Sequence, residues 1–176
     1  YVFSYLTSPN IKKIETGELV KEGRRSDGSW VVISPQGKTS RPTTNWREQS
    51  HDAGAYGTTL LRQLLPQRKF PFPKSLYAVE DILRLFVADK PAATIVDFFA
   101  GSGTTAHAVM RLNKQDGRRC QSIIVTNNEV AADEQKALRE KGLRPGDPEW
   151  ERLGICEYIT KPRIKAAATG KTPDGE

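Results

Sequence analysis

The stretch TIVDFFAGSGTTA (residues 94–106) decides the fold of this chain. Its first part, residues 94–99, is an apolar run interrupted only by Asp97, which predicts a strand buried on both faces. Gly101 and Gly103 predict a tight turn, because glycine permits positive φ angles and leaves out Cβ atoms where a ligand must approach the backbone. A helix that follows the turn presents free N–H groups to that ligand. Asp97, at the end of a buried strand, needs a partner, for which a ligand amine is suitable.

Helices and strands are expected to alternate around this stretch. The predicted elements are an amphipathic helix at 75–89, strands at 94–99 and 122–125, and helices at 104–112, 131–141 and 162–168. Ser75 is the expected N-cap of the first helix, and the prolines of FPFP (residues 70–73) predict an extended segment before it. Residues 150–159 fit either a helix or a short strand. This order predicts an α/β fold with a parallel sheet and flanking helices.

The first 45 residues differ from this pattern. Short apolar runs, including residues 11–14 and 30–33, alternate with turn signals at Thr16-Gly17 and Asp27-Gly28. Such alternation predicts a small antiparallel meander. Residues 35–45 have the composition of a linker. We therefore expect a β-rich segment with a linker at 1–45 and an α/β region at 46–176.

Composition and charge restrict the classes of function. The 176 residues are 37% hydrophobic and 27% charged, which is typical of a soluble globular protein. No apolar run approaches the roughly 18 to 20 residues that cross a bilayer, and the start lacks a signal-peptide pattern, so we expect a cytoplasmic location and no membrane partner. The formal net charge of +6 fits a polyanionic partner. Cys120 and Cys156 lack the spacing and the neighbours of a zinc or nucleophile motif, so no metal is expected.

The glycine turn also matches the dinucleotide-binding pattern GxGxxA at residues 101–106. A dinucleotide site requires an acid about 20 residues further on, where it binds a ribose hydroxyl at the end of the second strand. That position is occupied by Thr126, Asn127 and Asn128, with Glu129 just beyond. The missing acid weakens the interpretation as an NAD(P)-binding oxidoreductase fragment, which stays open as an alternative.

The segment DFFAGSGTTAHAV, which begins at Asp97, resembles motif I of the β-class DNA amino methyltransferases, particularly the modification (Mod) subunits of type III restriction systems. FPFPKSLYAVEDIL resembles the family's motif X, although Ser75 stands where the family often has a second proline. IIVTNNE resembles motif II. We use motif X helix for residues 75–89, motif I for 94–106 and motif II for 122–129. The order X, I, II is characteristic of this circularly permuted class, and weaker similarity continues through KPRIKAA (161–167).

This resemblance implies a Rossmann-like methyltransferase fold with a site for S-adenosyl-L-methionine (AdoMet). Motif I would pack along the methionine part of the cofactor, with Asp97 near its amino group. Lys74 and Ser75 would lie near the carboxylate, and Thr126 and Asn127 near the ribose. The family commonly has a polar or acidic residue at the position of Thr126, and this chain has no acid there. The implied cofactor-binding residues are Lys74, Ser75, Asp97, Phe98, Phe99, Ala100, Gly101, Ser102, Gly103, Thr104, Thr105, Thr126 and Asn127.

The resemblance also indicates what the chain lacks. Family members use an Asp/Asn/Ser-Pro-Pro-aromatic motif that binds the target amino group and stacks on the flipped base. The chain contains no Pro-Pro dipeptide, and in the permuted order that motif lies upstream. We therefore expect a C-terminal, AdoMet-binding portion of an enzyme, without catalytic residues of its own and inactive alone.

The implied reaction of the parent enzyme is methyl transfer to an exocyclic amino nitrogen of double-stranded DNA, at adenine N6 in preference to cytosine N4. The amino nitrogen would attack the AdoMet methyl group directly, helped by positioning and by base flipping. The resemblance leaves two protein partners open, a restriction subunit or a second copy of the enzyme. A DNA-binding module with a degenerate cofactor site is a further alternative, and it would bind duplex in a salt-dependent way while ignoring AdoMet.

Overall fold

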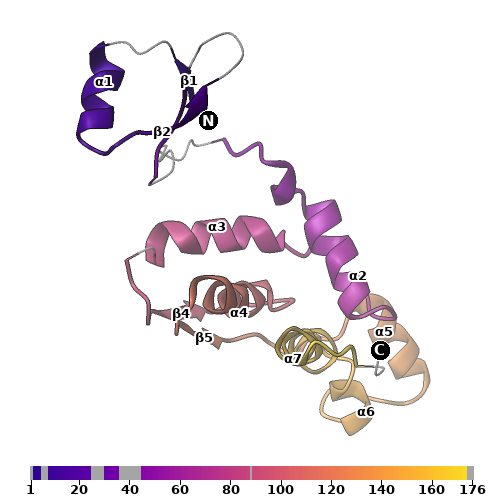
Figure 1. The fold of residues 1–176 in the computed structure, drawn as a ribbon. Coiled ribbons are helices and arrows are strands. Elements are labelled where there is room, and N and C mark those ends of the chain that lie inside the picture. The colour runs from indigo at the N-terminus through magenta and orange to yellow at the C-terminus, as the bar shows by residue number, and fades with distance from the viewer. Residues whose placement is uncertain (1, 5–7, 25–29, 36–44, 88, 174–176) are drawn as a thin grey trace. The chain divides into compact units, whose positions relative to one another are not determined.

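The computed structural model describes residues 2–4, 8–24, 30–35, 45–87 and 89–173. The chain divides into two compact units, Tyr1–Trp46 and Arg47–Glu176. Each unit has its own sheet, three-stranded in the first and two-stranded in the second (Figure 1). None of the helices in the described ranges has the length and apolar character needed to span a bilayer.

The first unit is a small antiparallel sheet with one helix. Its elements are β1 (Val2–Ser4), α1 (Ser8–Glu15), β2 (Val20–Arg24) and β3 (Trp30–Ile33), and β3 lies between the other two strands. The antiparallel sheet is therefore confirmed, but its strand order is not that of the predicted meander, and the strand predicted at residues 11–14 is wrong. The apolar pair Ile11 and Ile14 has a spacing of three, which suits α1, and the helix is followed by Gly17 at φ +79°. The Asp27-Gly28 turn and linker residues 36–44 lie outside the described residues.

The second unit begins with helical turns that lead to FPFP. These are the 3₁₀ turn η1 (Gln49–His51), the π-helical turn η2 (Gly54–Thr59) and the helix α2 (Leu60–Leu64). Residues 70–73 contain no helix, as predicted, but they are not uniformly extended. Phe72 has φ +51° and a side chain that is 90% exposed. A residue between two prolines is normally restricted to extended backbone, so this position is strained.

The rest of the second unit alternates helices and strands as the sequence predicts. Its elements are α3 (Leu76–Val87), β4 (Thr94–Asp97), α4 (Thr104–Asp116), β5 (Gln121–Ile124), α5 (Ala132–Glu140), α6 (Pro148–Glu151), η3 (Cys156–Thr160) and α7 (Lys161–Thr169). The ambiguous segment 150–159 is helical at both ends. The α/β class is confirmed.

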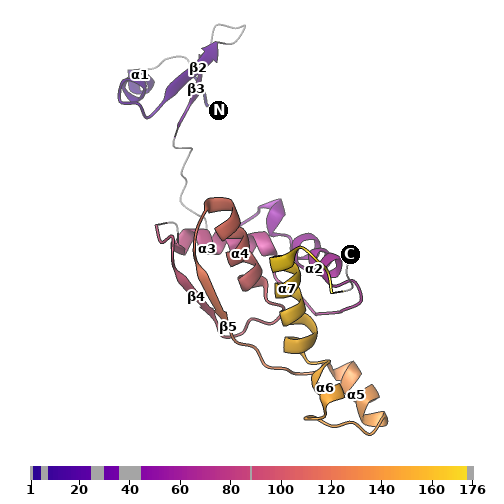
Figure 2. The same ribbon diagram turned by 60° about the horizontal axis from the view of Figure 1, so that its bottom comes forward.

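Strands β4 and β5 are parallel, with Val96 opposite Ile123 in the register. Helix α4 packs against β5, and α3 packs against α4 on the same side of the sheet (Figures 1 and 2). The burial on both faces that was predicted for the strand at residues 94–99 is therefore wrong for the described residues. Val96 is 47% and Ile123 is 52% exposed, whereas the alternate residues Ile95 and Ile124 are half-buried beneath the helices. One face of the pair is covered and the other is open.

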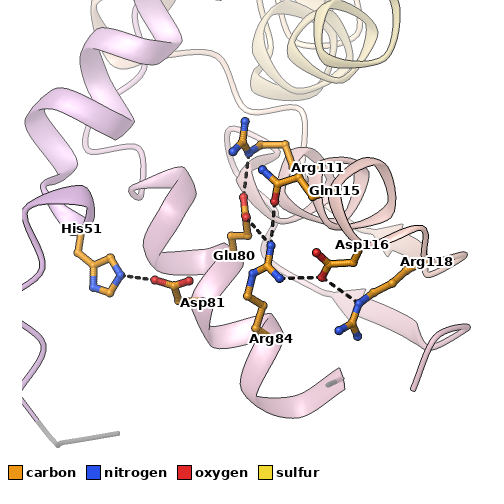
Figure 3. A network of polar contacts seen from close by, with 8 residues as sticks. All are labelled: His51, Glu80, Asp81, Arg84, Arg111, Gln115, Asp116 and Arg118. Atoms are coloured by element: carbon orange, nitrogen blue, oxygen red, sulfur yellow. Dashed lines mark hydrogen bonds and ion pairs between the residues drawn. The ribbon is translucent and has the colours of Figure 1, made fainter. Parts of the chain in front are cut away.

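A network of ion pairs joins α3 to α4 (Figure 3). At its centre, the buried carboxylate of Glu80 accepts hydrogen bonds from Arg111 Nε at 2.8 Å and from Arg84 Nη2 at 3.1 Å. Arg84 Nη1 also donates to the carboxylate of Asp116 at 2.7 Å, and the same carboxylate accepts a hydrogen bond from Arg118. Two guanidinium groups compensate the one buried carboxylate, so α3 and the motif X residues before it are held in position relative to α4.

Gly57 allows η2 to approach the backbone that leads into α3. A Cβ atom at this position would lie 2.3 Å from Pro73 O and 3.1 Å from Lys74 O, and neither backbone atom has room to move aside easily. We predict that Gly57→Ala lowers the free energy of unfolding by about 1–3 kcal/mol, measured by urea denaturation. Thr59→Ala, an exposed change in the same helical turn, is the matched control and should have little effect. Equal losses in both variants would contradict this packing.

Candidate functional site

Asp97 ends β4 and holds the turn that follows. Its Oδ1 accepts a hydrogen bond from Phe99 N–H at 3.0 Å, and its Oδ2 accepts one from Thr105 Oγ1 at 2.6 Å. The first bond turns the chain out of the strand two residues earlier than the sequence predicted. None of the ion pairs in the described part of the chain includes Asp97. Its negative charge is therefore left uncompensated by protein cations, and a carboxylate has further lone pairs for an additional donor.

The glycine turn has the backbone geometry that the sequence predicted. Gly101 has φ +49° and Gly103 has φ +77°, so both are left-handed. The predicted reason for the missing Cβ atoms is different from the observed one. A Cβ at Gly101 would lie 3.3 Å from the ring of Phe70, and one at Gly103 would lie 3.3 Å from the Thr160 methyl group. On the side where the Cβ atoms would project, the glycines make room for protein side chains.

Helix α4 begins at this turn without a side-chain cap. Its N-cap residue is Gly103, which has no side chain to accept a hydrogen bond from the first turn. The following N–H groups and the positive end of the helix dipole are therefore available to a polar or anionic ligand group. The side chains of Phe98 and Phe99 at the start of the turn are 67% and 94% exposed. Backbone donors, one carboxylate and apolar rings thus lie at the same edge of the sheet.

Motif II ends beside this turn. Ala100 N–H donates to Val125 O at 3.1 Å, and Val125 N–H donates to Asp97 O at 2.8 Å, so the pairing of β4 with β5 continues into the turn. Thr126 is half-buried and Asn127 is exposed, with the Asn127 amide 3.4 Å from Glu129 Oε2. The structure brings motif I and the predicted ribose-binding segment together.

Asn128, the next residue, has a structural function. Its amide Nδ2 donates to the backbone and side chain of Glu151, at 2.8 Å each, and its Oδ1 accepts from Glu157 N–H. These bonds connect the motif II loop with α6 and η3.

The motif X residues differ in their exposure. Lys74 is exposed, whereas Ser75 is buried. Ser75 Oγ donates to Ser50 O at 2.8 Å and accepts from Ala78 N–H at 3.4 Å, so it caps α3 as predicted. Its hydroxyl is occupied by the protein, and its predicted role beside the cofactor stays a prediction. The ring of Phe70, from the same motif, lies beside Gly101 of motif I, in the space that a Cβ atom at Gly101 would approach.

The C-terminal helical segment contributes contacts to motif I that the sequence analysis did not assign. Thr160 Oγ1 donates to Gly101 O at 2.6 Å. Arg163 is completely buried, and its Nη1 lies 2.9 Å from Ser102 Oγ and 2.8 Å from Thr104 Oγ1. The hydroxyls of Ser102 and Thr104 therefore face the protein interior. Burial lowers the pKa of the Arg163 guanidinium to about 10, so it remains charged at neutral pH. The similarity noted in KPRIKAA was the one signal for this contact.

The comparisons with known proteins identify the family of this chain. Residues 5–141 match the family described as DNA methylase. The chain belongs to the DNA methylase family, and membership implies a methyl-donor cofactor. The resemblance that its three motifs indicated is confirmed.

Three relatives illustrate the similarity. The type III restriction-modification enzyme StyLTI Mod subunit of Salmonella typhimurium is 32% identical over 159 residues, which cover 90% of this chain and 24% of that protein. The type III EcoPI Mod subunit of Escherichia phage P1 is 32% identical over 127 residues, which cover 72% of this chain and 18% of that protein. The type II methyltransferase M.KpnI of Klebsiella pneumoniae is 35% identical over 91 residues, which cover 52% of this chain and 21% of that protein. The chain thus spans about a fifth to a quarter of the length of these relatives.

His107 on α4 provides a pH-dependent test of this packing. Burial lowers its pKa to about 4, assisted by the charges of Arg163 and Arg111 and opposed by Glu80. The unfolded chain binds a proton near pH 6.5 and the folded chain does not, so this residue decreases stability as the pH falls from about 6.5 to 4. We predict that His107→Gln removes this loss. Relative to wild type, the variant should gain about 1–2 kcal/mol of unfolding free energy across that window. Urea denaturation at several pH values measures the difference, and a pH-independent difference would contradict the prediction.

Proposed function

We propose that the motif I turn binds AdoMet and that the protein containing this chain methylates adenine N6 in double-stranded DNA. The observation that carries the proposal is the uncompensated carboxylate of Asp97 beside the uncapped N-terminus of α4. AdoMet carries an ammonium and a carboxylate on its methionine part. A carboxylate and free N–H groups a few residues apart are complementary to that pair of charges.

The residues proposed to bind the cofactor keep their separate roles. Asp97 accepts from the ammonium group, while backbone groups of residues 98–105 line the methionine part. Lys74 and Ser75 lie at its carboxylate end, and Thr126 and Asn127 at its ribose. We infer that the two described parallel strands belong to a Rossmann-like methyltransferase sheet. No acid occupies the ribose position, which favours AdoMet over a dinucleotide.

The cofactor supplies an activated methyl group, and the described residues bind and orient it. Asp97 is oriented by its bonds to Phe99 and Thr105, so it presents its charge from a constrained position. We propose that the base-binding motif and the DNA contacts belong to parts of the protein outside this chain. The Mod-type relatives suggest a restriction subunit as a partner, and a cytoplasmic location follows from action on DNA.

Removal of the Asp97 charge tests cofactor binding. We predict that the 176-residue chain binds AdoMet and S-adenosyl-L-homocysteine (AdoHcy) in calorimetric titrations and does not bind NAD. Asp97→Asn keeps an acceptor for Phe99 N–H but loses the charge, and should weaken AdoHcy binding about tenfold or more. Asp133→Asn, an exposed carboxylate in α5, should leave the affinity unchanged. NAD binding without AdoMet or AdoHcy binding, or equal affinity in Asp97→Asn, would refute the proposal.

Methyl transfer is tested with the complete gene. Expressed in a host without adenine methylation, the complete protein should produce N6-methyladenine at a defined DNA sequence, mapped by sequencing of native DNA. The Asp97→Ala variant of the same gene should abolish the mark. N4-methylcytosine in its place would reassign the base, and the absence of both marks from a protein that binds AdoMet would argue against DNA as the substrate.

A further inference from the structure

Arg163 presents an unusual arrangement behind the glycine turn. It is the largest fully buried side chain of the described residues, with 0% of its surface exposed. Its Nη1 is the only one of its guanidinium nitrogens for which the described residues provide a hydrogen-bond partner, because Nε and Nη2 are buried without one. In the described part of the chain, no carboxylate forms an ion pair with it.

An unpaired buried cation is unfavourable for stability. Arg163 comes from the first turn of α7, where an apolar residue of similar length would pack without any cost of desolvation. Its neighbour Ala166 on the same helix face is buried and apolar. The charge at position 163 therefore requires a reason other than the stability of the core.

The contacts of Arg163 converge on motif I. Its Nη1 donates to Ser102 Oγ and Thr104 Oγ1 and lies 3.4 Å from Ser102 O. Ser102 and Thr104 flank Gly103, the N-cap of α4. Their hydroxyls are 3.1 Å apart, so one guanidinium nitrogen determines the orientation of both.

Two neighbours of Arg163 reinforce the same turn. Thr160 Oγ1 donates to Gly101 O, and the side chains of Thr160 and Ile164 occupy the space beside the missing Cβ of Gly103. The end of η3 and the start of α7 thus contact three successive residues of the turn, Gly101, Ser102 and Gly103. These contacts join residues about 60 positions apart in the sequence.

We infer that Arg163 is a positioning residue of the cofactor site, which acts through Ser102 and Thr104 to hold the AdoMet-binding turn in its binding conformation. The inference rests on the proposed function. It assigns a role in cofactor affinity to the end of the chain, beyond the residues 5–141 that match the DNA methylase family.

The test is to separate stability from affinity in the 176-residue chain. Arg163→Met keeps the length of the side chain and removes the buried charge, so its thermal midpoint should equal or exceed that of wild type. Its dissociation constant for AdoHcy should nevertheless rise about tenfold or more. Arg163→Lys, which retains one charged donor, should bind with intermediate affinity. Lys165→Met removes an exposed charge from the same helix and should bind as wild type does.

A folded Arg163→Met variant with wild-type AdoHcy affinity would overturn the inference. If Arg163→Met does not fold, Thr104→Val decides instead, since it keeps the side-chain shape and deletes one acceptor of the Arg163 bond. Weaker AdoHcy binding by Thr104→Val supports the positioning role, and unchanged binding overturns it. A wild-type chain that binds no AdoHcy would refute the proposed function itself, which distinguishes the two failures.

Discussion

The bond between the Asp97 carboxylate and Phe99 N–H is the constraint on which the second unit depends. It ends β4 and turns the chain, while the other carboxylate oxygen accepts from Thr105 in the first turn of α4. Strand, turn and helix are thereby joined by one side chain. Because none of the ion pairs among the described residues includes Asp97, the residue that shapes the turn also has a charge that is suited to a ligand ammonium.

The remaining elements support this turn from different directions. The compensated carboxylate of Glu80 connects α3 to α4. Phe70, which precedes the motif X helix in the sequence, lies beside the glycine turn. Thr160 and Arg163 hold the turn from the side of α7. The polar groups of the glycine turn are thus divided between two tasks. The hydroxyls of Ser102 and Thr104 bind protein groups, while the first-turn N–H groups of α4 have no side-chain cap and are available to a ligand.

Several features could be predicted from local sequence. The order of helices and strands after residue 75, the left-handed glycines and the Ser75 cap follow from periodicity, backbone sterics and capping chemistry, which act over a few residues. Two other expectations were wrong, because a short apolar pattern fits more than one structure. Residues 11–14 form part of α1, although a strand was predicted there. Apolar residues three positions apart lie on one face of a helix, so their spacing did not distinguish the two structures. The sheet is open on one face because α4 packs on the other and α3 packs on α4, and apolar composition alone does not specify which face the helices cover.

The sequence by itself determined that this chain has an α/β region built around a glycine turn, and its three motifs were sufficient to indicate the DNA methylase family. Those properties depend on short segments whose chemistry is local. Only the tertiary structure decided which side chains hold the turn. Arg163 and Ser102 are separated by 61 positions, and nothing in the helical pattern of α7 indicates that a buried arginine would lie there without a carboxylate. Contacts between distant segments arise from the packing of whole elements, so the side chains that hold the glycine turn became visible only in the folded chain.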